Sequence, residues 1–300
     1  MTNSSKPLLF FGNERLVSGL KSTDAPVLTA LIEHGYNIVG VVSHHSDGKS
    51  RNNRELEVAQ VAREHDIPVF LPNRPSEIRD ELIGLGAEAA ILVAYGRIIP
   101  QSIIDIFPKG IINIHPSLLP RYRGPTPIES AVANGDKQTG VSIMQLTAGM
   151  DEGPVYAQAA VPLLGTETKF DLYDTLAAAS VTLLLGNLPA ILDGSLQPDP
   201  QDDTKATYCQ LLSKTDSQLD PDAITASEAE CQVRAHLGFP KTKLTIAGHD
   251  IIITKAHVSS ESKTPLDIIC RDGAYLSIDE LIAPSGRIMN GEAFLRGYAA

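Results

Sequence analysis

The sequence predicts an α/β protein in which a parallel-sheet domain is followed by a small β-barrel domain. Short apolar runs alternate with helix-length segments through the first half of the chain, which is the rhythm of strands joined by crossover helices. A stretch rich in proline and acidic residues, DGSLQPDPQDDT, begins at Asp193 and breaks that rhythm. Closely spaced strand-like runs with glycine turns follow it, as is typical of a small barrel.

The first domain is predicted to hold buried strands, because its apolar runs are short and continuous rather than alternating. The strands are expected at Leu8–Phe11, Ile38–Val42, Pro68–Phe70, Ala89–Ala94 and Ile111–Ile114. Helices are expected at Ala25–His34, Arg54–His65, Ser76–Leu85, Gln101–Ile106 and Pro127–Asn134. Paired strands at Gly140–Leu146 and Val155–Val161 and a long helix at Lys169–Leu192 complete the domain.

The chain is expected to divide into a first domain at 1–192, a linker at 193–206 and a second domain at 207–300. An amphipathic helix is expected in the second domain, at Ser227–Leu237. Its strands are expected at Leu244–Ile246, Ile251–Val258, Leu266–Cys270 and Tyr275–Leu281, with turns at Gly248, Gly273 and Gly286.

Composition and charge exclude several classes of function. No run approaches the roughly 18 apolar residues of a membrane helix, and no secretory signal precedes the first strand, so we expect a cytoplasmic protein without a membrane partner. The three cysteines lack CxxC spacing, and the adjacent His44 and His45 lack further ligands nearby, so no metal is expected. The net charge of -11 disfavours nonspecific binding to DNA. Residues 1–150 hold 14 basic and 15 acidic groups, and residues 151–300 hold 11 and 21.

The segment IINIHPSLLPRYRG, at 111–124, carries the strongest signal of chemistry. Its apolar strand ends in Asn113 and His115, which are alternate residues and therefore share a face. In an open parallel sheet, ligands bind at the carboxyl ends of the strands. The same residues could instead end a strand at Pro116 and satisfy loose backbone groups.

A second signal lies in the turn between the paired strands, at Met150, Asp151, Glu152 and Gly153. On its own this is an ordinary hairpin turn. A carboxylate brought beside His115 would stabilise a protonated imidazole and fix which nitrogen carries the proton.

Two further segments lie at the expected ligand edge of the sheet. VAYGRIIP, at 93–100, ends a strand in Tyr95 and Gly96, where a glycine would let a flat ligand approach the backbone. The loop at 44–54 carries Lys49, Arg51 and Arg54 against a single acid, which suits either an RNA contact or a solvated loop. The first strand ends in FFGNE and matches neither GxGxxG nor the phosphate loop, so no nucleotide motif is present there.

NIHPSLLPRYRG, PIESAVANGD, TGVSIMQ and MDEGPV together closely resemble the methionyl-tRNA formyltransferase family. The similarity continues in order through QDDTKATYCQLLSK, RAHLGFP and GRIMNGEAFLRG, and thus covers almost the whole chain. The shorter core, NIHPSLLP with a downstream Asp, is similar to all folate-dependent formyltransferases. FFGNERLVS and RAHLGFPKT depart from the usual pattern, and the chain has no tryptophan.

The resemblance implies a Rossmann-like formyltransferase domain and an OB-like barrel that contacts tRNA. It implies transfer of the formyl group of 10-formyltetrahydrofolate to methionyl-initiator tRNA, for translation initiation. It places catalysis on Asn113, His115 and Asp151. The SLLP element of the family would place folate contacts on Ser117, Leu118, Leu119 and Pro120, and to these we add Tyr95, Gly96 and Ile98 of the segment at 93–100. Contacts to tRNA are expected at Lys49, Arg51, Arg54, Arg121, Arg123 and Arg234.

The chemistry of formyl transfer suggests roles for these residues. An amine attacks the formyl carbon, an oxyanion develops, and the folate nitrogen leaves with a proton. We expect protonated His115 and the amide of Asn113 to stabilise the oxyanion, and Asp151 to hold His115 and relay protons through water. Two alternatives stay open: a formyltransferase acting on a sugar nucleotide or another small amine, and a nonenzymatic RNA-binding protein with the same fold.

Overall fold

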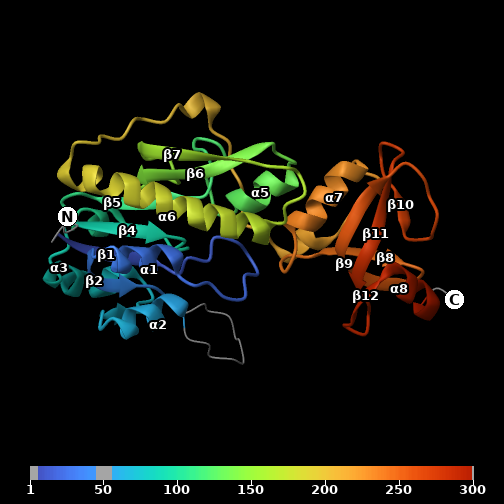
Figure 1. Ribbon diagram of the computed structural model, residues 1–300, viewed down its shortest axis with the longest axis horizontal. Coiled ribbons are helices and arrows are strands. Elements are labelled where there is room, and N and C mark those ends of the chain that lie inside the picture. Colours follow the sequence, from blue (N-terminus) through green and yellow to red (C-terminus); the bar gives the residue numbers. More distant parts are fainter. Residues whose placement is uncertain (1–5, 45–55, 299–300) are drawn as a thin grey trace.

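The structure, a computed structural model, describes residues 6–44 and 56–298. A sheet with the strand order β3-β2-β1-β4-β5-β6-β7 forms the centre of the first domain (Figure 1). Its strands are β1 (Pro7–Gly12), β2 (Asn37–Val42), β3 (Val69–Phe70), β4 (Ala89–Val93), β5 (Ile111–His115), β6 (Gln138–Gln145) and β7 (Val155–Pro162). All seven lie where the sequence predicts strands.

The sheet is mixed: its first five strands form the expected parallel part, and the predicted pair of strands β6 and β7 adds an antiparallel part. β1 to β5 pair in parallel, but β6 pairs antiparallel with both β5 and β7. The connection between β6 and β7 is too short for a crossover, which accounts for the antiparallel pairing of these two strands. The connection from β5 to β6 contains α5 and is long enough for a crossover, so its length does not explain the antiparallel pairing of β6 with β5. The register sets Asn113 opposite Met144 and His115 opposite Ser142.

Helices cover both faces of this sheet. They are α1 (Pro26–Glu33), α2 (Glu57–Glu64), the 3-10 turn η1 (Pro75–Ile78), α3 (Arg79–Gly84), α4 (Gln101–Ile104), α5 (Pro127–Ala133) and α6 (Lys169–Asp193). Side chains of β1 alternate between two cores: Leu8 and Phe10 pack with α1, α2, α5 and α6, and Leu9 and Phe11 pack with α3 and α4. The predicted helix at Ser76–Leu85 is split between η1 and α3.

The long helix α6 is apolar and long enough to cross a membrane by length and composition. It begins at a capping box formed by Thr168 and Asp171 and ends at Gly194, whose φ of 85° suits glycine. Leu172, Leu176 and Leu188 pack in the core beneath it. α6 is therefore a core helix of this domain.

The second domain has its own hydrophobic core. The segment before it includes the 3-10 turns η2 (Asp203–Lys205) and η3 (Lys214–Ser217). The domain is built from α7 (Ala226–Ala235), β8 (Thr242–Ile246), β9 (His249–Ser259), β10 (Asp267–Ile269), β11 (Tyr275–Ile282), β12 (Ile288–Asn290) and α8 (Gly291–Tyr298). β12 and α8 were not predicted.

The second domain contains an open antiparallel sheet in place of the expected closed barrel. Its order is β10-β11-β9-β8, with β12 on β11, and no pairing joins β10 to β8 within the described part of the chain.

The segment before this sheet is bound to the first domain. Thr207 and Cys209 exchange backbone hydrogen bonds with Arg123, so residues of the expected linker and the start of the second domain pack on the first domain.

Candidate active site

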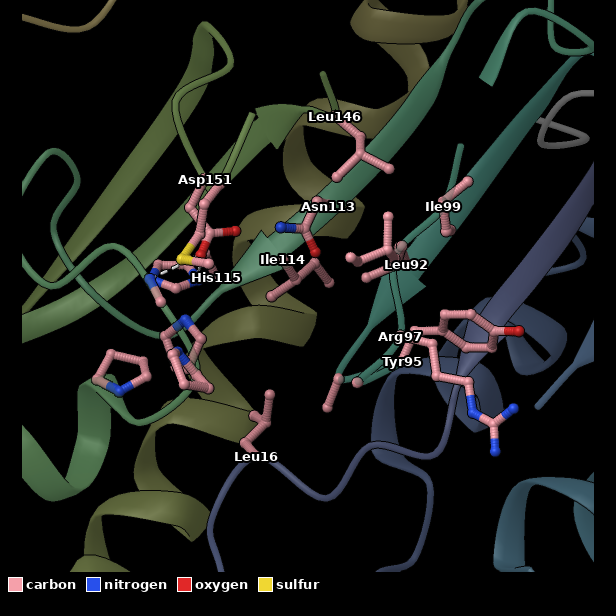
Figure 2. Close-up of a pocket in the computed structure, with 18 of the residues that line it drawn as sticks. Leu16, Leu92, Tyr95, Arg97, Ile99, Asn113, Ile114, His115, Leu146 and Asp151 are labelled. Carbon is pink, nitrogen blue, oxygen red and sulfur yellow. Dashed lines mark hydrogen bonds and ion pairs between the residues drawn. The ribbon is translucent and has the colours of Figure 1, made fainter. Parts of the chain in front are cut away.

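The carboxyl end of β5 carries the predicted pair of polar residues into a pocket. Asn113 and His115 are each only 5% exposed and line this pocket together with Asp151, as Figure 2 shows. His115 Nε2 lies 2.9 Å from the carbonyl oxygen of Tyr122, to which it donates, and its Nδ1 lies 3.7 Å from Asp151 Oδ2. That second distance is an ion-pair separation and exceeds a hydrogen bond.

Asp151 reaches His115 from the turn between β6 and β7. Its backbone has a φ of 51°, a left-handed conformation that Asp tolerates better than most residues. Its Oδ2 accepts a hydrogen bond of 2.8 Å from the backbone N–H of Gly124. The same oxygen therefore faces both the imidazole and the loop that follows β5.

The pocket has a volume of about 580 Å³, within the range of small-molecule sites. Its walls are largely apolar, with Leu16, Leu92, Ile99, Ile114 and Leu146 among the lining residues. His44, Arg15 and Arg97 add ionisable groups to the lining. The cavity can hold a flat apolar molecule beside the polar trio.

Tyr95 forms part of the pocket floor. It is 1% exposed and packs edge-on against Phe11, with the ring centroids 5.4 Å apart. Burial raises the pKa of its hydroxyl to about 12, and this hydroxyl has no hydrogen-bond partner in the described residues. Tyr95 is thus a neutral, rigid part of the wall, and its hydroxyl is enclosed by the protein.

The predicted folate residues divide into two groups. Tyr95, Gly96 and Ile98 line the pocket, and Ile98 is 86% exposed at its edge. The residues 117–120 do not line it: the Ser117 hydroxyl is buried and donates to the carbonyl of Arg121 at 2.6 Å. In this structure these four residues shape the loop beside the pocket.

The predicted tRNA residues are also divided. Lys49, Arg51 and Arg54 lie outside the described residues. The Arg121 side chain is 51% exposed and pairs with Asp136 at 3.0 Å. Arg234 is mostly covered and pairs with Glu230 at 2.6 Å.

Arg123 is a correction to the expected tRNA set. Its side chain is 1% exposed and its Nη2 lies 2.6 Å from Asp203. A guanidinium enclosed and paired in this way presents no donor to a phosphate. Sequence reasoning could not separate it from exposed Arg121, because both lie in the same basic loop.

Sequence reasoning also missed pocket residues. Leu92, Leu146 and Arg97 were not singled out, although each lies at or just beyond the carboxyl end of a strand. Gln201 was passed over as part of a linker, yet its side chain bonds to the turn that carries Asp151. A polar residue in a proline-rich stretch gives no sequence signal of such a contact.

Comparisons with known proteins agree with this geometry. The chain matches the model of the formyl transferase family over residues 15–188. It is 35% identical to the methionyl-tRNA formyltransferase of Pseudoalteromonas translucida, over 88% of this chain and 83% of that protein. It is 36% identical to the methionyl-tRNA formyltransferase of Chloroflexus aurantiacus, over 95% of this chain and 97% of that protein.

Solved structures share the fold at lower identity. HypX from Aquifex aeolicus in complex with tetrahydrofolic acid has a TM-score of 0.67 and 17% identity, over 98% of this chain and 48% of that chain. An N-formyltransferase from Helicobacter canadensis in complex with folinic acid and dTDP-3-aminofucose has a TM-score of 0.67 and 17% identity, over 91% and 98%. With its first domain matched by the family model and nearly all of its length by these relatives, the chain belongs to the formyl transferase family, alongside the methionyl-tRNA formyltransferases.

Proposed function

We propose that this protein transfers the formyl group of 10-formyltetrahydrofolate to the amino group of methionyl-initiator tRNA. The observation that carries the proposal is the convergence of Asn113, His115 and Asp151 on one wall of the pocket. The relatives at 35 and 36% identity are named methionyl-tRNA formyltransferases, which supports the same donor and acceptor for this chain.

The folate fits the pocket by size and by wall chemistry. A flat pterin ring suits the space between Leu92, Ile99 and Leu146. Tyr95 is almost fully buried and supplies a rigid aromatic wall on this side of the pocket. We assign folate contacts to Tyr95, Gly96 and Ile98, and give the residues 117–120 the task of shaping the adjacent loop.

The reaction forms one C–N bond and breaks another. The neutral amine of the aminoacyl group attacks the formyl carbon, which gives a tetrahedral oxyanion. Collapse of this intermediate breaks the bond between the carbon and N10 of the folate, and N10 takes the proton that the attacking amine loses. The protein must stabilise the oxyanion and move that proton.

His115 is arranged to act as a charged donor. Its Nε2 proton is directed at the Tyr122 carbonyl, so Nδ1 is the ring nitrogen that faces Asp151, and we assign the donated proton to Nδ1. Nδ1 is too far from Asp151 for a hydrogen bond and keeps its proton available to the oxyanion. We assign the second donor to Asn113, and the proton relay through water to Asp151.

The acceptor requires a surface beyond the pocket. We propose that Lys49, Arg51, Arg54, Arg121 and Arg234 contact tRNA and that the second domain completes an OB-like surface for it.

We also propose the division into domains at 1–192 and 207–300, a cytoplasmic location, and a reaction that needs no metal. Among the described residues, no group of three or more His, Cys, Asp or Glu is placed to hold a metal.

The test uses 10-formyltetrahydrofolate with a labelled formyl group and two acceptors in parallel. Label should appear on charged initiator methionyl-tRNA and not on small amines such as an amino sugar nucleotide. Label on the sugar nucleotide alone would favour the second candidate, which the net charge of -11 supports because it weakens attraction to a polyphosphate chain. No label on either acceptor would reject both enzymatic functions.

A further inference from the structure

We propose that Gln201, in the segment between the two domains, is a positioning residue for Asp151. It ties the turn that carries Asp151 to the loop that follows β5, and so fixes the distance between the carboxylate and His115. This inference rests on the proposed function, because it assumes that Asp151 takes part in formyl transfer.

The side-chain amide of Gln201 bridges the two segments with all of its hydrogen-bonding capacity. Its Nε2 donates to the carbonyl oxygens of Asp151 at 2.8 Å and of Gly153 at 2.7 Å. Its Oε1 accepts from Arg123 Nη2 at 2.9 Å and from Nε at 3.1 Å. An amide with both N–H groups and both lone pairs used is held in one orientation.

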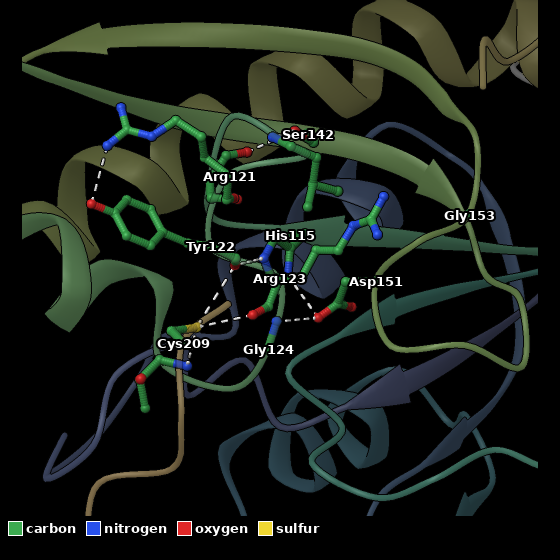
Figure 3. A network of polar contacts seen from close by, with 12 residues as sticks. His115, Arg121, Tyr122, Arg123, Gly124, Ser142, Asp151, Gly153 and Cys209 are labelled. Carbon is green, nitrogen blue, oxygen red and sulfur yellow. Dashed lines mark hydrogen bonds and ion pairs between the residues drawn. The ribbon is translucent and has the colours of Figure 1, made fainter. Parts of the chain in front are cut away.

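Arg123 makes the other end of this bridge rigid. Its buried guanidinium pairs with Asp203, and its backbone bonds to Thr207 and Cys209. The next residue, Gly124, donates its N–H to the Asp151 carboxylate (Figure 3). The loop that follows β5 therefore holds Asp151 in two ways. Gly124 donates a hydrogen bond to its carboxylate, and Arg123 holds its backbone through Gln201.

Two features of the turn make support from outside it useful. Asp151 has a left-handed backbone, which costs of the order of 1 kcal/mol or more in a non-glycine residue. The preceding Met150 is 62% exposed and gives little packing. Without Gln201, the contact from the Gly124 N–H would be left to hold the carboxylate, and the backbone of the turn would lose its side-chain donor.

The first experiment compares Gln201→Glu with Gln201→Ala. Glu keeps the contact with Arg123 but turns an acceptor toward the two carbonyl oxygens, which repels the turn; Ala removes both halves of the bridge. We expect both variants to lower the single-turnover rate of formyl transfer to methionyl-tRNA by about 10- to 100-fold, as small displacements of a reacting group do. The KM for 10-formyltetrahydrofolate should change by less than about threefold.

Gln197→Glu is the matched control. Gln197 lies in the same segment, is exposed, and donates only to the carbonyl of Gly194. It should keep the wild-type rate. Urea unfolding of each variant checks that it is folded, and Gln201→Met, which fills the space without hydrogen bonds, replaces Gln201→Glu if that variant does not fold.

A double-mutant cycle with Asp151→Asn separates positioning from a merely structural role. If Gln201 acts through Asp151, then Gln201→Ala should have little further effect on the residual rate of Asp151→Asn. An equal loss in both backgrounds, or an unchanged rate in Gln201→Glu, overturns this inference and leaves the proposed function intact. A near wild-type rate for Asp151→Asn alone would instead reject the proposed mechanism, and this inference with it.

Discussion

Two pairs of a basic and an acidic side chain in the first domain have the same separation but different surroundings. In the pocket, His115 Nδ1 lies 3.7 Å from Asp151 Oδ2. Behind the sheet, Lys169 Nζ lies 3.7 Å from Glu129 Oε1. The distance alone does not distinguish a reactive pair from a structural one.

Neighbouring residues make hydrogen bonds with most of the donors and acceptors of the Lys169–Glu129 pair. Lys169 is fully buried and donates to the Ser18 hydroxyl at 2.9 Å and to the Phe239 carbonyl at 2.7 Å. Glu129 Oε1 accepts from the backbone N–H and the hydroxyl of Ser18, both at 2.7 Å. Phe239 follows α7, so this pair fastens the second domain to the first.

The pair of His115 and Asp151 still has polar atoms that face the pocket. Asp151 is 18% exposed, and among the residues that the structure describes none lies at hydrogen-bond distance from Nδ1 of His115, beside a cavity of about 580 Å³. The comparison teaches that a basic and an acidic side chain in contact become a candidate for catalysis when both still face a ligand-sized space. A pair enclosed by protein stabilises the fold instead.

The largest expected effect is on turnover, in Asp151→Asn. Asn can still accept from Gly124, so the turn stays in place, but it carries no charge beside His115 and transfers no proton. We expect the rate of formyl transfer to fall by about 10²- to 10⁴-fold, while folate binding, measured by fluorescence quenching or calorimetry, stays near that of the wild type. Turnover close to the wild-type value would remove Asp151 from the mechanism. The pair of His115 and Asp151 would then be no more reactive than the pair of Lys169 and Glu129.

Lys169→Met should affect stability instead of chemistry. It leaves the Glu129 carboxylate buried without its cation, and Glu129 Oε2 already lacks a partner in the described residues. We expect a loss of about 3–5 kcal/mol in the free energy of unfolding, measured in urea. Adding Glu129→Gln should recover part of that loss, because Gln keeps an acceptor for Ser18 without the charge. If the double variant is no more stable than Lys169→Met, charge burial is not the cause.

The free energy of unfolding should also depend on pH through His236, which lies where the two domains meet near Lys169. Burial, followed by the positive charge of Lys169, lowers the pKa of His236 from 6.5 to about 4. The unfolded chain then binds a proton that the folded chain excludes, so this residue's contribution is complete above pH 6.5 and is lost as the pH falls toward 4. The loss amounts to about 3 kcal/mol for a shift of that size.

The measurement compares unfolding of the wild type and His236→Phe in urea from pH 7 to pH 4. Glu14 acts in the opposite direction, because burial raises its pKa to about 7 and the folded state holds its proton more tightly. The difference between the two proteins removes that contribution. Parallel curves for the two proteins would show that His236 does not supply the predicted slope.

The smallest effect is expected from Ile98→Ala at the pocket edge. Ile98 is 86% exposed, so its loss should change the free energy of unfolding by less than about 0.5 kcal/mol. We expect the KM for 10-formyltetrahydrofolate to rise a few-fold with kcat nearly unchanged, because only contact with the bound folate is reduced. An unchanged KM would place the folate away from this edge.

Most of the fold could be predicted because each strand of the first domain is a short apolar run with a clear end. The prediction that Asn113 and His115 share a face followed from the period of a strand, and the structure places both in the pocket. The antiparallel pairing of β6 with β5 was not predicted, and neither were β12 and α8. Strand direction depends on pairing partners, and β12 is only three residues long.

The candidate site shows the same division at the level of single residues. His115 and Asp151 were paired on chemical grounds, but nothing in the spacing showed that Arg123 would be buried or that Gln201 would reach the Asp151 turn. Both outcomes depend on the segment after α6 folding back over the loop that follows β5. A sequence pattern carries no signal of such a long-range contact.

By itself, the sequence determined which residue types stand at the carboxyl ends of the strands, since side-chain alternation and chain breaks are local properties. Only the tertiary structure decided which of these groups meet, which are enclosed by protein and which still face open space. The physical reason is that hydrogen-bond saturation and solvent exclusion arise from contacts between segments far apart along the chain.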